Sequence, residues 1–562
     1  MGKEIFIRIL SILIILLFFF TCYKCSGNQP QPAIIEPGKE IPPITGTPLL
    51  WGVDDAGANL NPMSEVSKRI VKEFGFDLFV HHYSPVVSYA ANATRLQNLH
   101  DFYSNLGVKW ILNMESANWS RSFVDEKGYD WYNRNDGRHY FQFPDEMLQL
   151  LSNMKNKPGL MYDEADHMQN GRNSTTIPDY DAPFFMSVEK ASSLEEAADN
   201  FTNEVQKIVQ QHEPYKLDIY TEHVFPIQFH TFARGGMIPV SKILKENVSP
   251  AYIATAIGAA IQYDKPFWLT PDLWHLNTYP GHSVDAYRSA LLLAYHMGAE
   301  AIYTENLSYD QNQKGQGSLV LMNEKKDNYR ITEYGKVAKW FRSDYAPKNP
   351  RNYTFKQLKP RVVIIRQEDA CWGQSNSWLP DQLFGIKEWK STPITEAWLQ
   401  IWHLLSRGKI SCHSISWHNQ KVQKQPYQLL YPLDGVVVFD HHVRMPHIKD
   451  AELIFLTGLS VSEPTLNDVK ELVKQGVVCV TLPHLAPSEV IAKTGSNGVL
   501  TDGQGKWIVC ESFLKLKGDP ELDPFLPTGD YIRYQFGNTE VKFTPVGGDN
   551  NKITVNITPI TN

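Results

Sequence analysis

Short apolar runs alternate with amphipathic stretches from residue 49 to about residue 345. Apolar residues recur with helical spacing in the longer stretches, for example over residues 194–211 and 284–297. The short runs have the length and composition of buried parallel strands. There are eight of them: 50–54, 77–81, 109–113, 159–162, 217–220, 236–240, 266–270 and 301–304. Eight strand–helix units in succession predict an α/β fold that begins with a (β/α)₈ TIM barrel, over residues 49–345.

A second α/β pattern follows the barrel, over residues 360–510. Its strands, at 361–365, 435–439, 453–456 and 477–481, are separated by helical stretches. This order predicts a flavodoxin-like doubly wound domain. Residues 520–562 then alternate as short strands, which predicts a small C-terminal antiparallel β domain. No phosphate loop or GxGxxG motif accompanies either pattern, so we expect no cofactor.

The N-terminal segment has the pattern of an export signal. A charged start is followed by an apolar run over residues 5–20, and Cys22 comes directly after it. A cysteine at this place resembles the lipobox of bacterial lipoproteins. Residues 1–22 are therefore expected to be a signal peptide/lipoprotein segment, and residues 23–48, rich in Pro and Gly, a disordered linker. We expect an exported cell-envelope lipoprotein, in the periplasm or on the outer-membrane surface, held on the membrane by a lipid anchor, with soluble secretion as the alternative.

Composition narrows the function classes. The net charge of −7 offers no basic surface for nucleic acid, so we expect no nucleic-acid partner. The four cysteines after the linker, Cys371, Cys412, Cys479 and Cys510, lack zinc spacing, and we expect neither a structural metal nor a disulfide framework.

Polar residues gather where the predicted barrel strands end. The clusters are Asp54-Asp55, His81-His82, Asn113 with Glu115, Asp163-Glu164, Glu222-His223, Asp272 with Trp274, and Glu305-Asn306. The carboxyl ends of barrel strands meet at one face, which carries the active site in this fold. The sequence therefore predicts a site at that face.

The order of the three domains resembles that of the three-domain β-galactosidases, whose middle domain mediates trimerisation, and more broadly that of the clan A retaining glycoside hydrolases. Asp163-Glu164 stands where that clan keeps its acid/base, and Leu456-Thr-Gly-Leu459 resembles part of the trimerisation domain. The resemblance implies a glycosidase and a possible homo-oligomer. The chain departs from the clan at its seventh predicted strand, which ends in Asp272 without a glutamate. Either a strand is miscounted and Glu305 ends the seventh, or another carboxylate is the nucleophile.

Glycosidic cleavage needs one carboxylic acid that protonates the leaving oxygen and a second carboxylate that attacks the anomeric carbon or activates water. We expect Glu164 as the acid, with a pKa raised by acidic neighbours in the sequence. Glu305 and Glu222 follow the same Ile-Tyr-Thr motif at two strand ends. Glu305 is the preferred nucleophile, with Glu222 and then Asp272 as alternatives, and a retaining enzyme requires carboxyl groups roughly 5–5.5 Å apart.

The remaining polar residues at these strand ends are candidates for binding sugar hydroxyls. They are Asp54, His82, Asn113, Asp163, His223, Asp272, Trp274 and Asn306. Trp119, Trp268 and Trp274 are candidate stacking platforms, but each of them by itself is expected to belong to the core. Histidines such as His82 and His275 are expected to bind hydroxyls or simply to pack, rather than to bind a metal. The predicted substrate is an oligosaccharide or polysaccharide. The alternative is a non-catalytic surface lipoprotein that captures glycans on a barrel scaffold.

Overall fold

The computed structural model describes most of the chain after the predicted linker. The described residues are 41–55, 63–118, 124–131, 140–171, 184–223, 227–245, 247–274, 282–310, 317–373, 381–416, 419, 422, 424 and 427–560. The predicted export signal, Cys22 and most of the linker lie outside them, as do Trp119 and His275. Within the described residues, no helix has both the length and the apolar character needed to cross a membrane.

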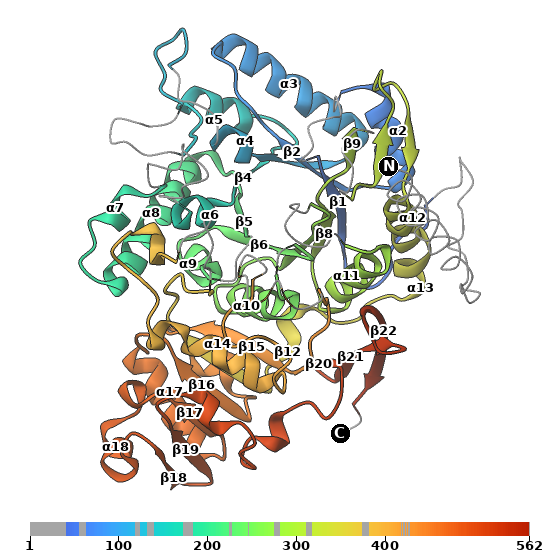
Figure 1. Cartoon of the computed structure of the whole chain (residues 1–562). Helices are drawn as coiled ribbons and strands as arrows, with labels where there is room; N and C mark the ends of the chain where they lie inside the picture. Colours follow the sequence, from blue (N-terminus) through green and yellow to red (C-terminus); the bar gives the residue numbers. More distant parts are fainter. Residues whose placement is uncertain are drawn as a thin grey trace, which may run out of the picture. The chain divides into compact units, whose positions relative to one another are not determined.

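A closed barrel of eight parallel strands forms the first part of the fold, in the order β1 to β8 (Figure 1). The strands are β1 (Leu50–Asp54), β2 (Leu78–His82), β3 (Lys109–Asn113), β4 (Gly159–Asp163), β5 (Ile219–His223), β6 (Ile238–Ile243), β7 (Trp268–Pro271) and β8 (Ala301–Thr304). All eight predicted strands are present, so the predicted TIM barrel is confirmed. Glu305 follows β8, which means that the strands were counted correctly and no glutamate ends β7.

Helices follow the strands. They are α2 (Glu65–Phe74), α3 (Tyr89–Leu106), α4 (Glu115–Asn118), α5 (Asp145–Ser152), α6 (Ala165–Asn170), α7 (Met186–Glu189), α8 (Leu194–His212), α9 (Phe229–Arg234), α10 (Ser249–Gln262), α11 (Val284–His296), α12 (Glu333–Trp340) and α13 (Ala346–Lys348). The long helices begin at local signals. Ser64, Ser193 and Ser283, for example, each accept a hydrogen bond from a backbone N–H three residues on.

The barrel interior has an apolar lower part and a polar upper part. Side chains alternate along a strand, so residues two apart share a face. The apolar part is built from Leu78, Val80, Ile111, Met161, Tyr220, Val240, Trp268, Ala301 and Tyr303. Gly159 leaves room for Tyr220, because a Cβ at this glycine would lie 2.6 Å from the Tyr220 ring. Two residues further along each strand the same inward face carries polar side chains.

The sixth strand is longer than predicted, and its extra residues include a lysine. It runs over Ile238–Ile243, three residues beyond the predicted end at Val240. Ile238, Val240 and Lys242 therefore share one face. Since Ile238 and Val240 pack in the barrel interior, the strand carries the Lys242 side chain into the same interior.

The second α/β region contains a six-stranded sheet in the order β15-β13-β16-β17-β19-β18. Its strands are β13 (Val362–Arg366), β15 (Val436–Asp440), β16 (Leu453–Thr457), β17 (Val478–Thr481), β18 (Gly498–Asp502) and β19 (Gly505–Val509), with helices α14 (Pro393–Leu405), α16 (Met445–Ile448), α17 (Glu463–Lys474) and α18 (Ser488–Thr494). Five strands are parallel, in flavodoxin-like order, and β18 is an antiparallel edge. The predicted doubly wound fold is confirmed.

The C-terminal sheet contains more strands than the sequence pattern indicates. Its antiparallel core is β20 (Ile532–Phe536), β21 (Thr539–Val546) and β22 (Asp549–Pro559). Two short strands from earlier in the chain, β12 (Leu358–Lys359) and β14 (Leu433–Asp434), pair with β20. A separate three-stranded sheet follows the barrel and contains β9 (Ser308–Asp310), β10 (Val320–Met322) and β11 (Tyr329–Ile331).

The six-stranded sheet packs closely on the barrel helices α9 and α10. A Cβ at Gly258 in α10 would lie 1.7 Å from the carbonyl oxygen of Val438, so only glycine permits this approach. His230 in α9 contacts the same carbonyl oxygen through Nε2 at 3.1 Å. Glu368, which follows β13, accepts hydrogen bonds from the backbone N–H groups of His230 and Thr231. The carboxyl ends of β13 and β15, where doubly wound domains commonly bind ligands, thus contact the barrel.

Candidate active site

Lys242 lies at the centre of the polar upper part of the barrel, which we call the mouth. Its ammonium nitrogen is 2.9 Å from a carboxylate oxygen of Glu305 and 3.6 Å from oxygens of Asp163, Glu164 and Glu222. The lysine side chain is 1% exposed. A buried ammonium is stable only with such partners. One lysine on β6 therefore gathers acidic residues from β4, β5 and the end of β8.

A second lysine extends this group. Lys245, two residues after β6, lies 3.3 Å from Glu164 and 3.2 Å from Asp272. Asp272 follows β7 and forms a parallel bridge with Glu305. The two lysines and the five acidic residues that contact them are hereafter the lysine cluster: Lys242, Lys245, Asp163, Glu164, Glu222, Asp272 and Glu305. It contains all three predicted catalytic glutamates.

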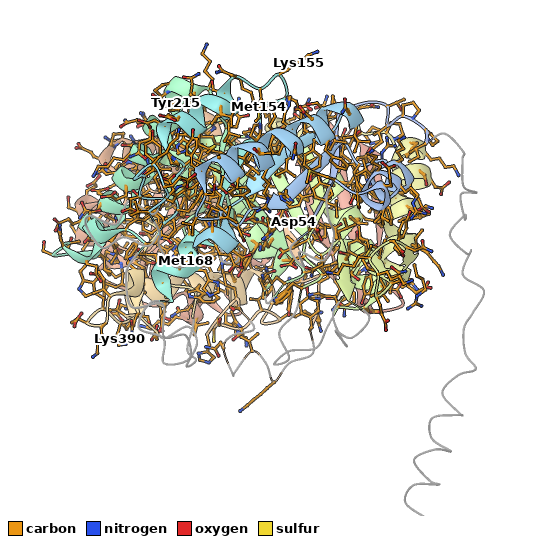
Figure 2. All side chains as sticks on the ribbon, turned by 90° about the horizontal axis from the view of Figure 1, so that it is seen from above. Asp54, Met154, Lys155, Met168, Tyr215 and Lys390 are labelled. Atoms are coloured by element: carbon orange, nitrogen blue, oxygen red, sulfur yellow. The ribbon has the colours of Figure 1, made fainter. Side chains whose placement is uncertain are left out.

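Figure 2 relates this mouth to the rest of the barrel. Met154 lies in the loop that precedes β4, Tyr215 ends a short 3-10 helix that precedes β5, and Met168 lies in α6, which follows β4. The two groups lie on opposite sides of Asp54, which ends β1 (Figure 2). The lysine cluster belongs to the side reached after the strands end, as the barrel fold requires of an active site.

The lysines keep two of the glutamates ionised. Burial alone would raise the pKa of Glu164, but the charges of Lys245, Lys242 and His167 outweigh burial and hold its pKa well below the usual range. Glu305 is likewise buried, and Lys242 and Lys245 lower its pKa to about 2. The prediction that acidic neighbours raise the Glu164 pKa is wrong, because the groups closest to it in space are cations.

Other carboxyl groups of the mouth are shifted in the opposite direction. Burial, with the charges of Asp163 and Glu305, raises the pKa of Glu222 well above its usual range despite Lys242. Burial and the charge of Glu305 do the same for Asp272. Burial raises the pKa of Asp163 to about 6. Ionised and neutral carboxyl groups thus stand side by side, which is the arrangement that acid–base chemistry uses.

A histidine connects the cluster with the first three strands. His82 Nε2 lies 3.0 Å from Asp54, and its Nδ1 lies 3.4 Å from Glu115. Burial alone would lower the pKa of His82, but Asp54 and Glu115 raise it to about 10. Asn113 donates a hydrogen bond of 2.9 Å to Asp163. The predicted binding residues Asp54, His82, Asn113 and Asp163 are therefore neighbours of the catalytic candidates.

One group in the described part of the chain has the spacing of metal ligands. His82, Glu115 and Asp163 offer ligand atoms within 4.8 Å of one another. Each ring nitrogen of His82 faces a carboxylate, so the doubly protonated ring satisfies both. A protonated imidazole has no lone pair for a metal. We therefore assign this group to polar contacts of the protonated His82 ring.

The backbone is strained where three strands of the mouth end. Glu164, Leu244 and Asn306 have φ angles of 53°, 74° and 75°, in the left-handed region that side chains disfavour. Each such residue costs about 1–3 kcal/mol and persists only where the surrounding structure imposes it. Leu244 immediately precedes Lys245, and Glu164 is itself in the cluster. The strained backbone therefore lies within or next to the lysine cluster.

Some predicted residues lie elsewhere. His223 is fully buried on the other face of β5, between Asp166 at 3.1 Å and the rings of Phe229 and Phe232, so its prediction as a sugar ligand is not supported. Trp268 packs against Tyr220 inside the barrel and is part of the core. Trp274 is half-buried, and its backbone N–H donates to Asp272. Asn306 is buried, and its carbonyl accepts a hydrogen bond from Leu319.

The comparisons with known proteins concern the fold. No family model matches the sequence, and no curated protein is similar enough in sequence to match it. Among solved structures, the cold-adapted β-galactosidase from Rahnella sp. R3 is 12% identical, with a TM-score of 0.50, and the match covers 93% of this chain and 100% of that chain. This chain has the fold of that enzyme. The predicted resemblance to clan A barrels with additional domains is confirmed at the level of fold.

Two further solved structures are more distant. An exo-β-1,4-mannosidase from Opitutaceae bacterium strain TAV5 is 12% identical, with a TM-score of 0.45, and the match covers 84% of this chain and 94% of that one. The catalytic module of a family 98 glycoside hydrolase from Streptococcus pneumoniae TIGR4 is 11% identical, with a TM-score of 0.42, and covers 91% and 74% respectively.

Sequence reasoning missed Lys242 and Lys245, and it placed Glu115 at a strand end without assigning it a role. A signal for Lys242 is present, because a single cation stands in the apolar run Val240-Ser-Lys-Ile243. A lysine in a buried strand requires acidic partners, and the strand ends supply them.

Proposed function

We propose that the protein is a glycoside hydrolase that cleaves O-glycosidic bonds of oligosaccharides or polysaccharides at the mouth of the barrel. One observation carries the proposal. Glu164 and Glu305 contact the same ammonium group, at 3.6 and 2.9 Å. Their contacting oxygens are therefore no more than about 6.5 Å apart, so both carboxylates can face one anomeric centre, as the two-carboxylate chemistry of glycosidases requires.

The proposed roles follow from charge and access. Glu305 is ionised and is the carboxylate that attacks the anomeric carbon. Glu164, also ionised, is the second carboxylate at the reacting centre. Their side chains are 6% and 8% exposed, whereas those of Glu222 and Asp272 are 0% exposed. A substrate can reach Glu305 and Glu164 more easily. Glu222 and Asp272, which are fully buried, are proposed to hold these two carboxylates in position. The fold shared with a β-galactosidase supports this proposal.

The test uses aryl glycosides of several sugars and the variant Glu305→Ala. We expect turnover by the wild-type protein, loss of at least about 10⁴-fold in kcat for the variant, and partial rescue by azide with formation of a glycosyl azide. Glu333→Gln is the control, because Glu333 is exposed and pairs only with Lys336 among the described ion pairs. Glycan binding without turnover on any substrate would instead support the capture protein.

We also propose that a lipid on Cys22 attaches the protein to a membrane and that the doubly wound domain forms an oligomer interface. The apolar run before Cys22 supports the first proposal. The second rests on the resemblance of the middle domain to a trimerisation domain.

A further inference from the structure

Glu115 differs from the other carboxyl groups of the mouth in its electrostatic surroundings. Glu164 and Glu305 each contact a lysine ammonium. Among the described ion pairs, Glu115 pairs with His82 alone, at 3.4 Å. Burial, together with the negative charges of Glu164 and Asp163, raises the pKa of Glu115 to about 8, against the opposing effects of His82 and Lys242. At neutral pH Glu115 therefore holds a proton while Glu164 does not.

Access distinguishes Glu115 as well. Its side chain is 27% exposed, compared with 8% for Glu164, 6% for Glu305 and 1% for Asp163. Glu115 is thus the most exposed of these four described acidic groups of the mouth. A proton donor must come within hydrogen-bond reach of the leaving oxygen of a bound glycoside, and the exposed carboxyl group of Glu115 allows this approach.

The position of Glu115 is fixed from two sides. It begins α4 two residues after β3, and its backbone N–H donates to the side chain of Asn113 at 2.9 Å. Its carboxyl oxygen lies within 4.8 Å of ligand atoms of both His82 and Asp163. Asn113 in turn donates to Asp163. Glu115 is therefore held beside β4, whose end carries Glu164.

We propose that Glu115 is the catalytic acid of the proposed glycosidase, in place of Glu164. The inference rests on the proposed function. The bond between the anomeric carbon and the leaving oxygen breaks, its electron pair stays on that oxygen, and the oxygen takes the proton of Glu115. The carboxylate of Glu305 bonds to the anomeric carbon. Water then replaces Glu305 on that carbon and returns a proton to Glu115, so the net reaction consumes one water.

Leaving-group dependence tests this assignment. In Glu115→Gln, we expect kcat/KM to fall by about 10²–10⁴ for alkyl glycosides, which need protonation, and by less than about tenfold for dinitrophenyl glycosides. Glu164→Gln should slow both substrate classes to a similar degree, because Glu164 is ionised and does not supply the proton. Glu333→Gln should change neither. The reverse pattern, with selective loss in Glu164→Gln, would overturn the proposal.

The pH profile gives a second readout. An acid must be protonated to act, so the wild-type rate should fall as pH rises through about 8. The charged groups that face Glu115 are His82 on β2, Asp163 and Glu164 at β4, and Lys242 on β6. With alkyl glycosides, whose leaving oxygen needs the proton, this alkaline limb should disappear in Glu115→Gln, and Glu115→Asp should shift it. An unchanged limb in both variants would refute the assignment.

The two proposals fail differently. If the wild-type protein hydrolyses no glycoside, the proposed function is wrong. If the wild type is active and Glu305→Ala is inactive, but Glu115→Gln retains full activity on alkyl glycosides, only the role of Glu115 is wrong. Circular dichroism and the melting temperature of each variant show whether it is folded. If Glu115→Gln is not folded, the pH profile of Glu115→Asp, which keeps a carboxylic acid, decides the role of Glu115.

Discussion

Replacing Lys242 by Met should show how much the mouth depends on this one ammonium group. The substitution keeps a flexible side chain of similar length but removes the charge that contacts four carboxyl groups. One ion pair at this separation contributes roughly 4 kcal/mol at an effective dielectric constant of 20. Removing one partner of a buried pair costs about 3–5 kcal/mol, and we expect a loss of that size in the free energy of unfolding near pH 7.

The loss should depend on pH in a defined direction. In the wild type the pKa of Glu305 is lowered from 4.5 to about 2, so its stabilising contribution is complete above pH 4.5 and disappears as pH falls toward 2. Without Lys242, the pKa of Glu305 rises from about 2, because Lys245 remains but the larger of the two lysine effects that oppose burial is gone, and the ionised form loses stability in the fold. Acid relieves this penalty by protonating the carboxyl group. The difference between the wild type and Lys242→Met should therefore narrow as pH falls from neutral to about 3.5.

Urea unfolding at about pH 7, 5 and 3.5 measures this effect. Lys336→Met is the control, because Lys336 is 47% exposed and pairs with the exposed Glu333. It should change stability by less than about 1 kcal/mol at every pH. A loss for Lys242→Met that is equally large at all three pH values would mean that packing, and not charge, explains the position. A loss below about 1 kcal/mol near pH 7 would refute the electrostatic account.

Four further predictions concern other parts of the chain. Glu222→Gln should change the free energy of unfolding by less than about 1 kcal/mol, measured in urea, because the raised pKa keeps the native carboxyl neutral and the amide has its shape. Glu368→Leu should lower stability by about 1–3 kcal/mol for each donor left without a partner at His230 and Thr231, and thermal unfolding that matches the wild type would contradict this. Cys22→Ser should move the protein from the membrane to the soluble fraction on cell fractionation, and an unchanged distribution would count against the lipid anchor. Sedimentation should show an oligomer, and a monomer at about micromolar concentration would argue against an interface on the doubly wound domain.

The barrel could be predicted because its strands and helices have strong, regular periodicity. Boundaries are weaker signals, and at β6 an error of three residues concealed the residue on which the site is centred. Lys242 lies inside the strand, and only the correct end shows that it shares a face with Val240. The short strands β12 and β14 have two residues each and no periodicity that a sequence could show.

The chemistry of the mouth was only partly accessible from sequence. Which glutamates end strands can be read along the chain, and Glu164, Glu222 and Glu305 were found in this way. Their protonation depends on neighbours across the barrel, and the lysines come from a strand about 60 to 80 residues away from Glu164 and Glu305. Sequence neighbours of Glu164 are acidic, whereas its neighbours in space include Lys245 at 3.3 Å. The sign of its pKa shift therefore could not be obtained from the sequence.

The close contact between α10 and β15 limits how this chain can be divided. β15 is an edge strand of its sheet, and the carbonyl oxygen of Val438 at this edge meets Gly258 and His230. A fragment that begins after the barrel would expose the edge to water and to other copies of itself. Uncovered edge strands pair readily between molecules. The doubly wound domain is thus unsuited to exchange or expression as an independent module, and any shortened form of the protein must retain α9 and α10.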